Sequence, residues 1–227
     1  DDLNAGDEVL TTNHEYGAMD KTWEYFCKMN GLIYNKQKIQ IPVKDHKDFI
    51  EKFWEGVNKK TKIIFISHIT SSTALIFPIK EICKRARIQG ILTIIDGAHA
   101  PGHVALNISN INPDIYVGAC HKWMCTPKGT AFLYVNKKIQ NKIIPLVISW
   151  GWESEYQSDS EFIDRHEWQG TNDFSSYLVV PDAIDLMKKY QWNKVSLNCR
   201  KLLKQSYKEI MDLFNSFPIS PINFEWI

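Results

Sequence analysis

The chain has 227 residues, of which 44% are hydrophobic, and its net charge is +1 with both signs of charge interspersed. This length suits one large domain or one and a half typical ones, with enough apolar residues for a core. The balanced charge gives no reason to expect nucleic acid or an anionic membrane as a partner, and no apolar run approaches the roughly 20 residues of a membrane helix.

The first part of the chain alternates short apolar runs with amphipathic segments. A 3.6-residue apolar period predicts a helix from about Met19 to Asn30, which Gly31 ends. Asp45 is a candidate N-cap for a second helix. Strands are predicted beside these helices at Glu8–Thr12, Leu32–Tyr34 and Ile63–Ser67.

The same alternation continues in the second part. Pro78 begins a helix that Gly90 ends. Strands are then predicted at Ile91–Ile95, Ile115–Gly118 and Thr130–Val135, followed by two long helices at Asp173–Tyr190 and Asn193–Asn215. Strands that alternate with helices indicate an α/β fold with a mainly parallel, mixed sheet flanked by helices.

Chemically useful side chains follow two of these strands. Asp96 and His99 come directly after one apolar run, and His121-Lys122 follow the next. In open α/β sheets ligands bind beyond the carboxyl ends of the strands, so an acid, an imidazole and a lysine are expected to meet at one edge. An ordinary ion pair would explain Asp96 and Lys122 as well.

The stretches Asp96-Gly97-Ala98-His99, His121-Lys122-Trp123 and Pro127-Lys128-Gly129 resemble the class V aminotransferase family. Members of this family are fold type I enzymes dependent on pyridoxal phosphate (PLP). The resemblance implies that Asp96 pairs with the pyridinium nitrogen, that His99 lies near the phenolic oxygen, and that Lys122 forms the covalent link to the cofactor. It also implies the large domain of the fold type I enzymes.

The residue types suit the chemistry that the resemblance implies. PLP is an electron sink that the protein orients and tunes, and a partly desolvated lysine supplies a reactive amine. Many members of the family carry Gln where this chain has His99. Histidine there resembles the isopenicillin N epimerase branch, which also includes C–S lyases.

Two further candidates come from neighbouring stretches. His14-Glu15-Tyr16-Gly17-Ala18 resembles the family segment that lays an aromatic ring over PLP, which implies that Tyr16 binds the cofactor and is the candidate second acid. A surface tyrosine before a helix is the alternative. The stretch from His68 to Ser71 resembles the segment that touches substrate and cofactor, which makes Ser71 a candidate ligand.

The cofactor phosphate has fewer candidates. The resemblance makes His121 a donor, whereas Ala119 stands where relatives often have Ser or Asn, so one contact is expected to be missing. Thr171 matches a turn that reaches the partner's phosphate in the family's dimers, which implies a homodimer. A simple helix cap by Thr171 or Asp173 would explain that turn equally well.

The resemblance runs from Gly6 to about Tyr190. Relatives carry a further segment before it, with a Gly/Thr-rich phosphate turn of the helix-terminus kind, and a small C-terminal domain after it. We therefore expect residues 1–190 to be a PLP-binding large domain without its N-terminal part. Residues 191–227 are expected to lead into a C-terminal domain that is mostly absent.

The expected function is a PLP-dependent reaction at Cα or Cβ of an amino acid, by an epimerase or a C–S lyase. One alternative is a cysteine desulfurase, although such enzymes usually have His and Gln at the positions of Tyr16 and His99. Another is a non-catalytic fragment or scaffold, which Ala119 and the missing phosphate turn favour and which Asp96 and Lys122 oppose.

The five cysteines are scattered and odd in number, which favours a reducing, cytoplasmic setting; a targeting signal before residue 1 is left open. Cys120, His121 and Cys125 make a poor metal site because no second Cys/His pair lies at finger spacing. We therefore expect no metal.

Overall fold

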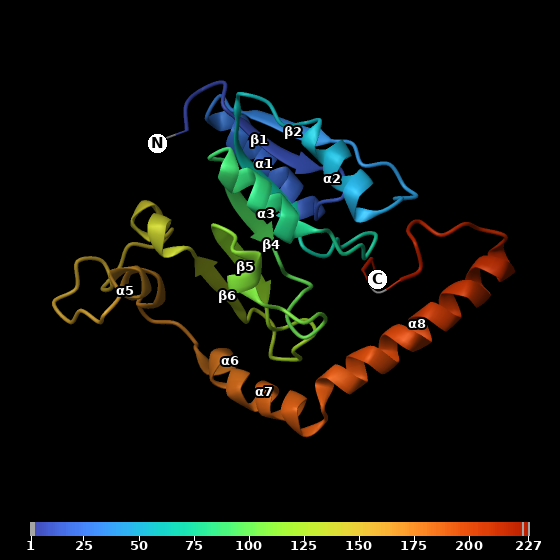
Figure 1. Ribbon diagram of the computed structural model, residues 1–227. Coiled ribbons are helices and arrows are strands. Elements are labelled where there is room, and N and C mark those ends of the chain that lie inside the picture. Colours follow the sequence, from blue (N-terminus) through green and yellow to red (C-terminus); the bar gives the residue numbers. More distant parts are fainter. Residues whose placement is uncertain (1–2, 224, 227) are drawn as a thin grey trace.

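One six-stranded sheet dominates the computed structural model, which describes residues 3–223 and 225–226 (Figure 1). Its order is β2-β1-β3-β4-β5-β6, and all pairs are parallel except β5 with β6. This confirms the predicted α/β fold with a mainly parallel, mixed sheet. The strands are β1 (Glu8–Thr12), β2 (Ile33–Gln37), β3 (Thr61–Ser67), β4 (Leu92–Asp96), β5 (Ile115–Ala119) and β6 (Ala131–Val135).

Helices connect the first five strands and follow the last one. Asp45 caps its helix as predicted, because its side chain accepts a hydrogen bond from the Asp48 backbone N–H at 2.8 Å. The helices of the described residues are α1 (Gly17–Met29), α2 (His46–Trp54), α3 (Ile79–Ile88), α4 (Ile108–Ile111), the 3-10 helix η1 (Lys137–Lys142), α5 (Glu161–Glu167), α6 (Ser175–Leu178), α7 (Val180–Lys189) and α8 (Trp192–Phe214).

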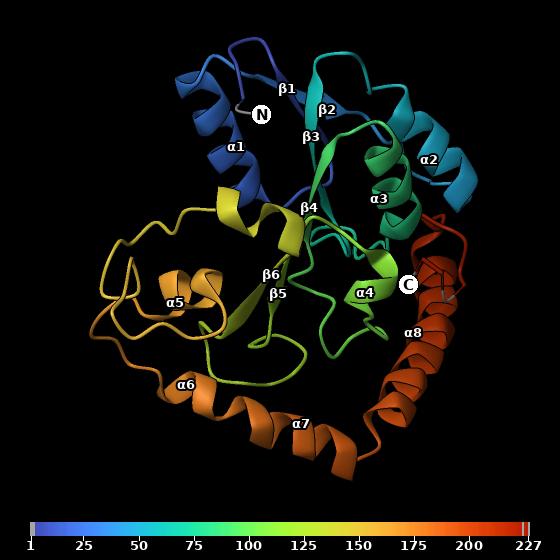
Figure 2. The ribbon, with the colours of Figure 1, turned by 60° about the vertical axis from the view of Figure 1, so that its left-hand side comes forward.

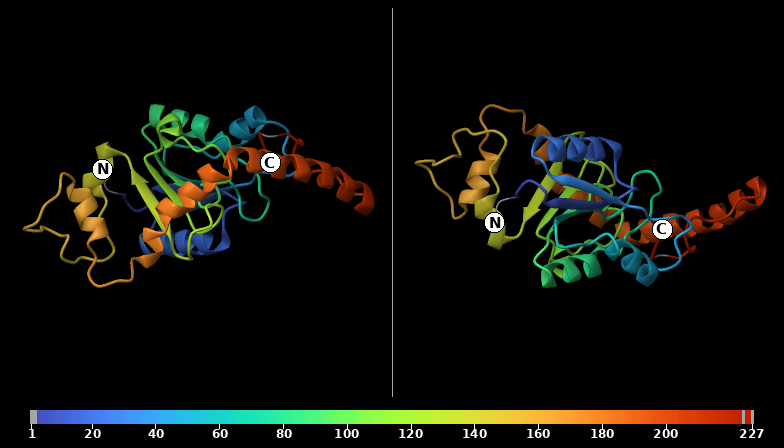
Figure 3. Two further views of the ribbon diagram at one scale, coloured as in Figure 1. Left: turned by 90° about the horizontal axis from the view of Figure 1, so that it is seen from below. Right: turned by 90° about the horizontal axis from the view of Figure 1, so that it is seen from above.

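The sheet is covered on both faces, with α1 on one side and α2 and α3 on the other (Figures 2 and 3). Alternate residues of β3 therefore enter different cores. Ile64 and Ile66 belong to the larger cluster, with Phe49 and Phe53 of α2. Phe65 belongs to the smaller cluster under α1. Burial on both faces explains why β3 is a continuous apolar run.

The helix predicted at Asp173–Tyr190 is in fact two helices. α6 ends at Leu178 and α7 begins at Val180, with Pro181 in its first turn. Proline has no backbone N–H and therefore cannot continue the hydrogen-bond ladder of a preceding helix, but it is tolerated in a first turn. The predicted long helix ending at Asn215 is confirmed as α8.

The division into domains at residues 190 and 191 stays a prediction. It coincides with a turn at Gln191, which has a positive φ of 50° between α7 and α8. α8 extends away from the sheet before the chain returns to it (Figure 1), and Trp226 is buried beside Phe49. Residues 1, 2, 224 and 227 of the two predicted domains lie outside the described residues.

Within the described residues, none of the helices combines the length and the apolar character that crossing a bilayer requires.

The larger core generates a stability prediction. Phe53 is completely buried, and truncating such a side chain removes its burial and leaves a cavity. We expect Phe53→Ala to lower the free energy of unfolding by about 3–5 kcal/mol, measured by urea denaturation. Phe217→Ala is the matched control because Phe217 is 88% exposed; equal losses in both variants would contradict the assignment of the core.

Candidate active site

The candidate site lies where parallel strands end together. Ser67 at the end of β3 pairs with Asp96 at the end of β4, and Asp96 in turn pairs with Val117 of β5. His121 and Lys122 follow two and three residues after Ala119, the last residue of β5. The predicted meeting of acid, imidazole and lysine therefore has a structural basis in strand register.

Lys122 and His99 are in direct contact. The Lys122 Nζ lies 3.0 Å from His99 Nε2, and the Trp123 indole N–H points to His99 Nδ1 at an N–N distance of 3.4 Å. If Nδ1 accepts from Trp123, the neutral ring carries its proton on Nε2, facing the lysine. With the other tautomer, His99 Nε2 would instead accept from the Lys122 ammonium; in both cases the contact places the amine beside the imidazole.

Burial, and next the positive charge of Lys122, lower the pKa of His99. The imidazole is thus held uncharged at neutral pH.

The loop after β4 also packs closely against the turn after β5 at Gly102, where an added Cβ would lie 2.7 Å from the Trp123 carbonyl oxygen. Gly102 thereby lets the loop after β4 approach the turn that carries Lys122.

Asp96 is held by its own turn. Its Oδ1 accepts a hydrogen bond from the Ala98 backbone N–H at 3.0 Å, which fixes the carboxylate at the strand end. The Tyr116 ring lies against the next residue, Gly97, where an added Cβ would be 2.1 Å from the ring. Glycine is therefore required for Tyr116 to pack next to Asp96.

Tyr116 and His68 form a buried pair near Asp96. The Tyr116 hydroxyl lies 2.8 Å from His68 Nδ1. Burial lowers the pKa of His68 to about 4, and burial together with the charge of Asp96 raises the pKa of Tyr116 above its usual range. Both side chains are consequently uncharged at neutral pH, and neither neutralises Asp96.

Sequence reasoning assigned no role to Glu15, which the structure brings to this site. Its Oε2 accepts hydrogen bonds from the Ser67 backbone N–H at 2.9 Å and the Ser67 hydroxyl at 2.6 Å, and its Oε1 accepts from the Thr12 hydroxyl at 2.6 Å. Burial raises the pKa of Glu15 from 4.5 to about 7, and the charge of Asp96 adds to the rise. A carboxyl group between a strand and a helix gives no sequence signal that it turns inward.

The other predicted residues are less closely linked. Tyr16 stands at the N-terminus of α1 and is 53% exposed, so its ring is available to a ligand. Ser71 is exposed in the loop after β3, and Thr171 is exposed between α5 and α6. In the described part of the chain, no hydrogen bond connects either of them to Asp96, His99 or Lys122; their roles stay predictions.

His121 has one ring nitrogen engaged. Its Nδ1 lies 3.0 Å from the Thr130 carbonyl oxygen, which only accepts, so Nδ1 carries the proton. Nε2 of the neutral ring is then an acceptor, and His121 can donate to an anion through Nε2 only as an imidazolium. Ala119 is buried and offers no side-chain donor; the missing phosphate contact stays a prediction.

Comparison with known proteins gives consistent matches. The family described as "Aminotransferase class-V" matches residues 1–217. Isopenicillin N epimerase of Amycolatopsis lactamdurans is 29% identical over 96% of this chain and 58% of its own length. A probable chloroplastic L-cysteine desulfhydrase of Arabidopsis thaliana is 28% identical over 83% of this chain and 41% of its own length.

Solved structures match the fold at lower identity. The apo structure of a cysteine desulfurase from Thermococcus onnurineus NA1 has a TM-score of 0.78 and 19% identity, covering 92% of this chain and 52% of that chain. The chain thus spans about half the length of the proteins it resembles.

The raised pKa of Glu15 predicts a pH-dependent stability. Because the folded protein holds this proton more tightly than the unfolded chain, the contribution is complete below about pH 4.5 and is lost as pH rises through about 7. Glu15→Gln has no such loss. Between about pH 4.5 and 7, the Tm of Glu15→Gln relative to that of the wild type is therefore expected to rise with pH. Thermal melts of both proteins at each pH measure this difference.

The exposed Glu155→Gln serves as the control because it removes the same charge from the surface. A Tm difference for Glu15→Gln that stays constant from about pH 4.5 to 8 would contradict the burial of the Glu15 carboxyl.

Proposed function

Because this chain belongs to the class V aminotransferase family, we propose that the protein containing these 227 residues is a PLP-dependent enzyme acting at Cα or Cβ of an amino acid. The match over residues 1–217 confirms the family that the motifs around Asp96 and Lys122 predicted. The main support for the proposal is the 3.0 Å contact between Lys122 Nζ and His99 Nε2. This contact lies at the sheet edge where β4 ends in Asp96.

The side chains present fit the cofactor. Lys122 offers an amine for the cofactor's aldehyde, Asp96 offers a carboxylate for a protonated ring nitrogen, and the exposed Tyr16 offers an aromatic face. When bound, PLP supplies the electron sink that weakens bonds to the substrate Cα. The uncharged Tyr116 and His68 leave the Asp96 charge free to act on the ring nitrogen.

The proposed reaction begins with proton transfer to Lys122. The free amine of Lys122 would remove the Cα proton as general base, and His99 would orient that amine. Asp96 stabilises the developing charge through the ring nitrogen. Return of a proton to the opposite face, with Tyr16 as the acid, would invert Cα.

Loss of a β-substituent after the same first step would instead cleave a C–S bond. Similarity to isopenicillin N epimerase, at 29% identity, and to a cysteine desulfhydrase, at 28%, is compatible with both outcomes. Incubation with cysteine decides between them for that substrate: sulfide release indicates the lyase, whereas racemisation without sulfide indicates the epimerase.

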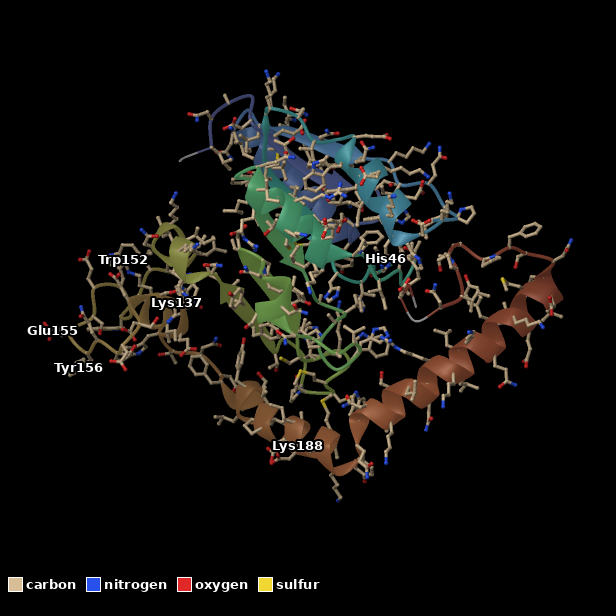
Figure 4. The ribbon with its side chains drawn as sticks, viewed as in Figure 1. His46, Lys137, Trp152, Glu155, Tyr156 and Lys188 are labelled. Carbon is tan, nitrogen blue, oxygen red and sulfur yellow. The ribbon has the colours of Figure 1, made fainter. Side chains whose placement is uncertain are left out.

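We propose further that the protein is a homodimer. Residues 143–160, here called the outer segment, expose many large apolar side chains, and Trp152, Glu155 and Tyr156 lie at the outer edge of the molecule (Figure 4). Such a surface favours a protein partner. The exposed apolar residues of this segment are Ile144, Leu146, Val147, Ile148, Trp150 and Tyr156.

The covalent cofactor link gives the first test of the proposal. Borohydride reduction of the natural protein with PLP is expected to fix the cofactor on Lys122, because this amine is the one placed beside His99 and Asp96. Peptide mass spectrometry locates the label. The Lys122→Ala variant should lose the label, and the Lys128→Ala variant should keep it. Labelling of Lys128 would overturn the assignment of Lys122. Absence of any label in the natural protein would favour a scaffold.

Replacement of Asp96 separates catalysis from binding. Asp96→Asn keeps the side-chain shape and its acceptor for the Ala98 N–H but removes the charge that stabilises the transition state. We expect turnover to fall on the order of 100-fold or more, while PLP affinity, followed by absorbance, changes far less. Turnover within a few-fold of wild type would contradict the role of Asp96.

The outer segment provides a test of the homodimer. Light scattering of the natural protein should give twice the mass of one chain, and replacing both Leu146 and Trp150 by Glu should halve it, because charge is costly in an apolar interface. Phe217→Glu is the control, since Phe217 is equally apolar and 88% exposed. A monomeric wild type would refute the dimer.

A further inference from the structure

The Glu15 carboxylate connects two parts of the site that are distant in sequence. Glu15 belongs to the loop between β1 and α1, whereas both of its Oε2 contacts are with Ser67 at the end of β3. Ser67 is the strand partner of Asp96. Through these hydrogen bonds, Glu15 connects the loop that contains Tyr16 to β3, the strand next to Asp96.

The hydrogen bonds between Glu15 and Ser67 span the point between β1 and β3 at which the strand order of the sheet reverses. From β1 the chain goes to β2 on one side, and then returns to β3 on the other. The helices that follow β1 and β3, α1 and α3, cover opposite faces (Figure 3). Loops diverge at such a switch point and leave a crevice in which ligands bind, and Glu15 spans its two sides.

The loop has separate attachments toward its other neighbour. Asn13 accepts a hydrogen bond from the Ile39 backbone N–H at 2.7 Å, and His14 Nε2 lies 2.9 Å from the Ile39 carbonyl oxygen. Both hold the loop to the segment after β2, and His14 Nδ1 also lies 3.4 Å from the Thr73 hydroxyl in the loop after β3. The hydrogen bonds of Glu15 to Ser67 hold it on the β3 side, where Asp96 lies.

We propose that Glu15 is a positioning residue, which fixes Tyr16 relative to Asp96 by joining the β1–α1 loop to the end of β3. The inference deepens the proposed function, since it depends on the roles given there to Tyr16 and Asp96. Tyr16 is the next residue along the chain, and its own side chain makes no capping bond at α1. Its position is therefore set by the backbone that Glu15 anchors.

The groups that face Glu15 allow geometry to be separated from charge. Thr12 on β1 and Ser67 on β3 donate to it. Beyond the effect of burial, the charge of Asp96 on β4 raises the pKa of Glu15, and the charge of Glu15 contributes to the raised pKa of the Tyr34 phenol on β2. Glutamine in its place would accept from Ser67 through its carbonyl and donate its amide N–H to the Thr12 hydroxyl oxygen. Glu15→Gln thus keeps the connection without charge, whereas Glu15→Ala removes it.

Glu8 offers a matched control. Like Glu15, it is a glutamate that joins the β1 side to β3, since its carboxylate accepts from the Thr61 hydroxyl at 2.6 Å and from Asn58 Nδ2 at 2.9 Å; Glu8 is buried, whereas Glu15 is partly buried. Thr61 begins β3, so this connection lies at the opposite end of the same two strands. Glu8→Ala should cost stability in the same way without disturbing the site.

The test is a PLP titration of the complete natural polypeptide, followed by absorbance and by visible circular dichroism, which reports how rigidly bound PLP is oriented. Glu15→Ala should raise the PLP dissociation constant roughly tenfold and weaken the dichroic band. Glu15→Gln should restore both to near wild type, and Glu8→Ala should leave both unchanged. If Glu15→Ala does not fold, Ser67→Ala replaces it and should shift both readouts in the same direction.

Each outcome has one meaning. Wild-type protein that takes up no PLP at Lys122 refutes the proposed function and this inference with it. Wild type that binds PLP while Glu15→Ala binds equally well refutes the inference alone. Equal losses in Glu8→Ala and Glu15→Ala also refute it, because they would show only a general loss of stability.

Discussion

Parallel pairing of β3, β4 and β5 is the constraint on which the site depends. Parallel strands all end at one edge, so Ser67, Asp96 and the turn carrying Lys122 are brought together although they are far apart in sequence. Antiparallel pairing of β4 with β5 would send Lys122 to the opposite edge. The helices on both faces stabilise this pairing by covering it.

At neutral pH, the titratable side chains His68 and Tyr116 near Asp96 are uncharged, and Glu15 is only partly ionised. Burial keeps His68 and Tyr116 uncharged and raises the pKa of Glu15 to about 7. The Asp96 carboxylate is thus not paired with a cation from within the sheet. The carboxylate is therefore available to pair with a cation bound at the strand ends. In the proposed enzyme that cation is the protonated ring nitrogen.

The loop after β4 also links the site to α8. The Trp192 indole N–H donates to the Gly102 carbonyl at 2.7 Å, and the Ser196 hydroxyl donates to the His103 carbonyl at 3.1 Å. His103 in turn packs on Trp123, with ring centroids 4.6 Å apart. A movement of α8 would consequently reach the residues beside Lys122 through this loop.

The sequence by itself determined the elements with strong local signals. Apolar runs predicted the strands and Asp45 predicted a helix start, because both signals depend on residues close in the chain. The family followed from the resemblance of the short stretches around Asp96 and Lys122 to class V aminotransferases. The sequence analysis predicts one helix where the structure has α6 and α7, although Pro181 marks the first turn of α7. Only the tertiary structure decided that Glu15 turns inward to Ser67 and that His68 meets Tyr116, contacts that span 52 and 48 residues. Such contacts depend on strand order and packing between distant segments, and no local pattern records them.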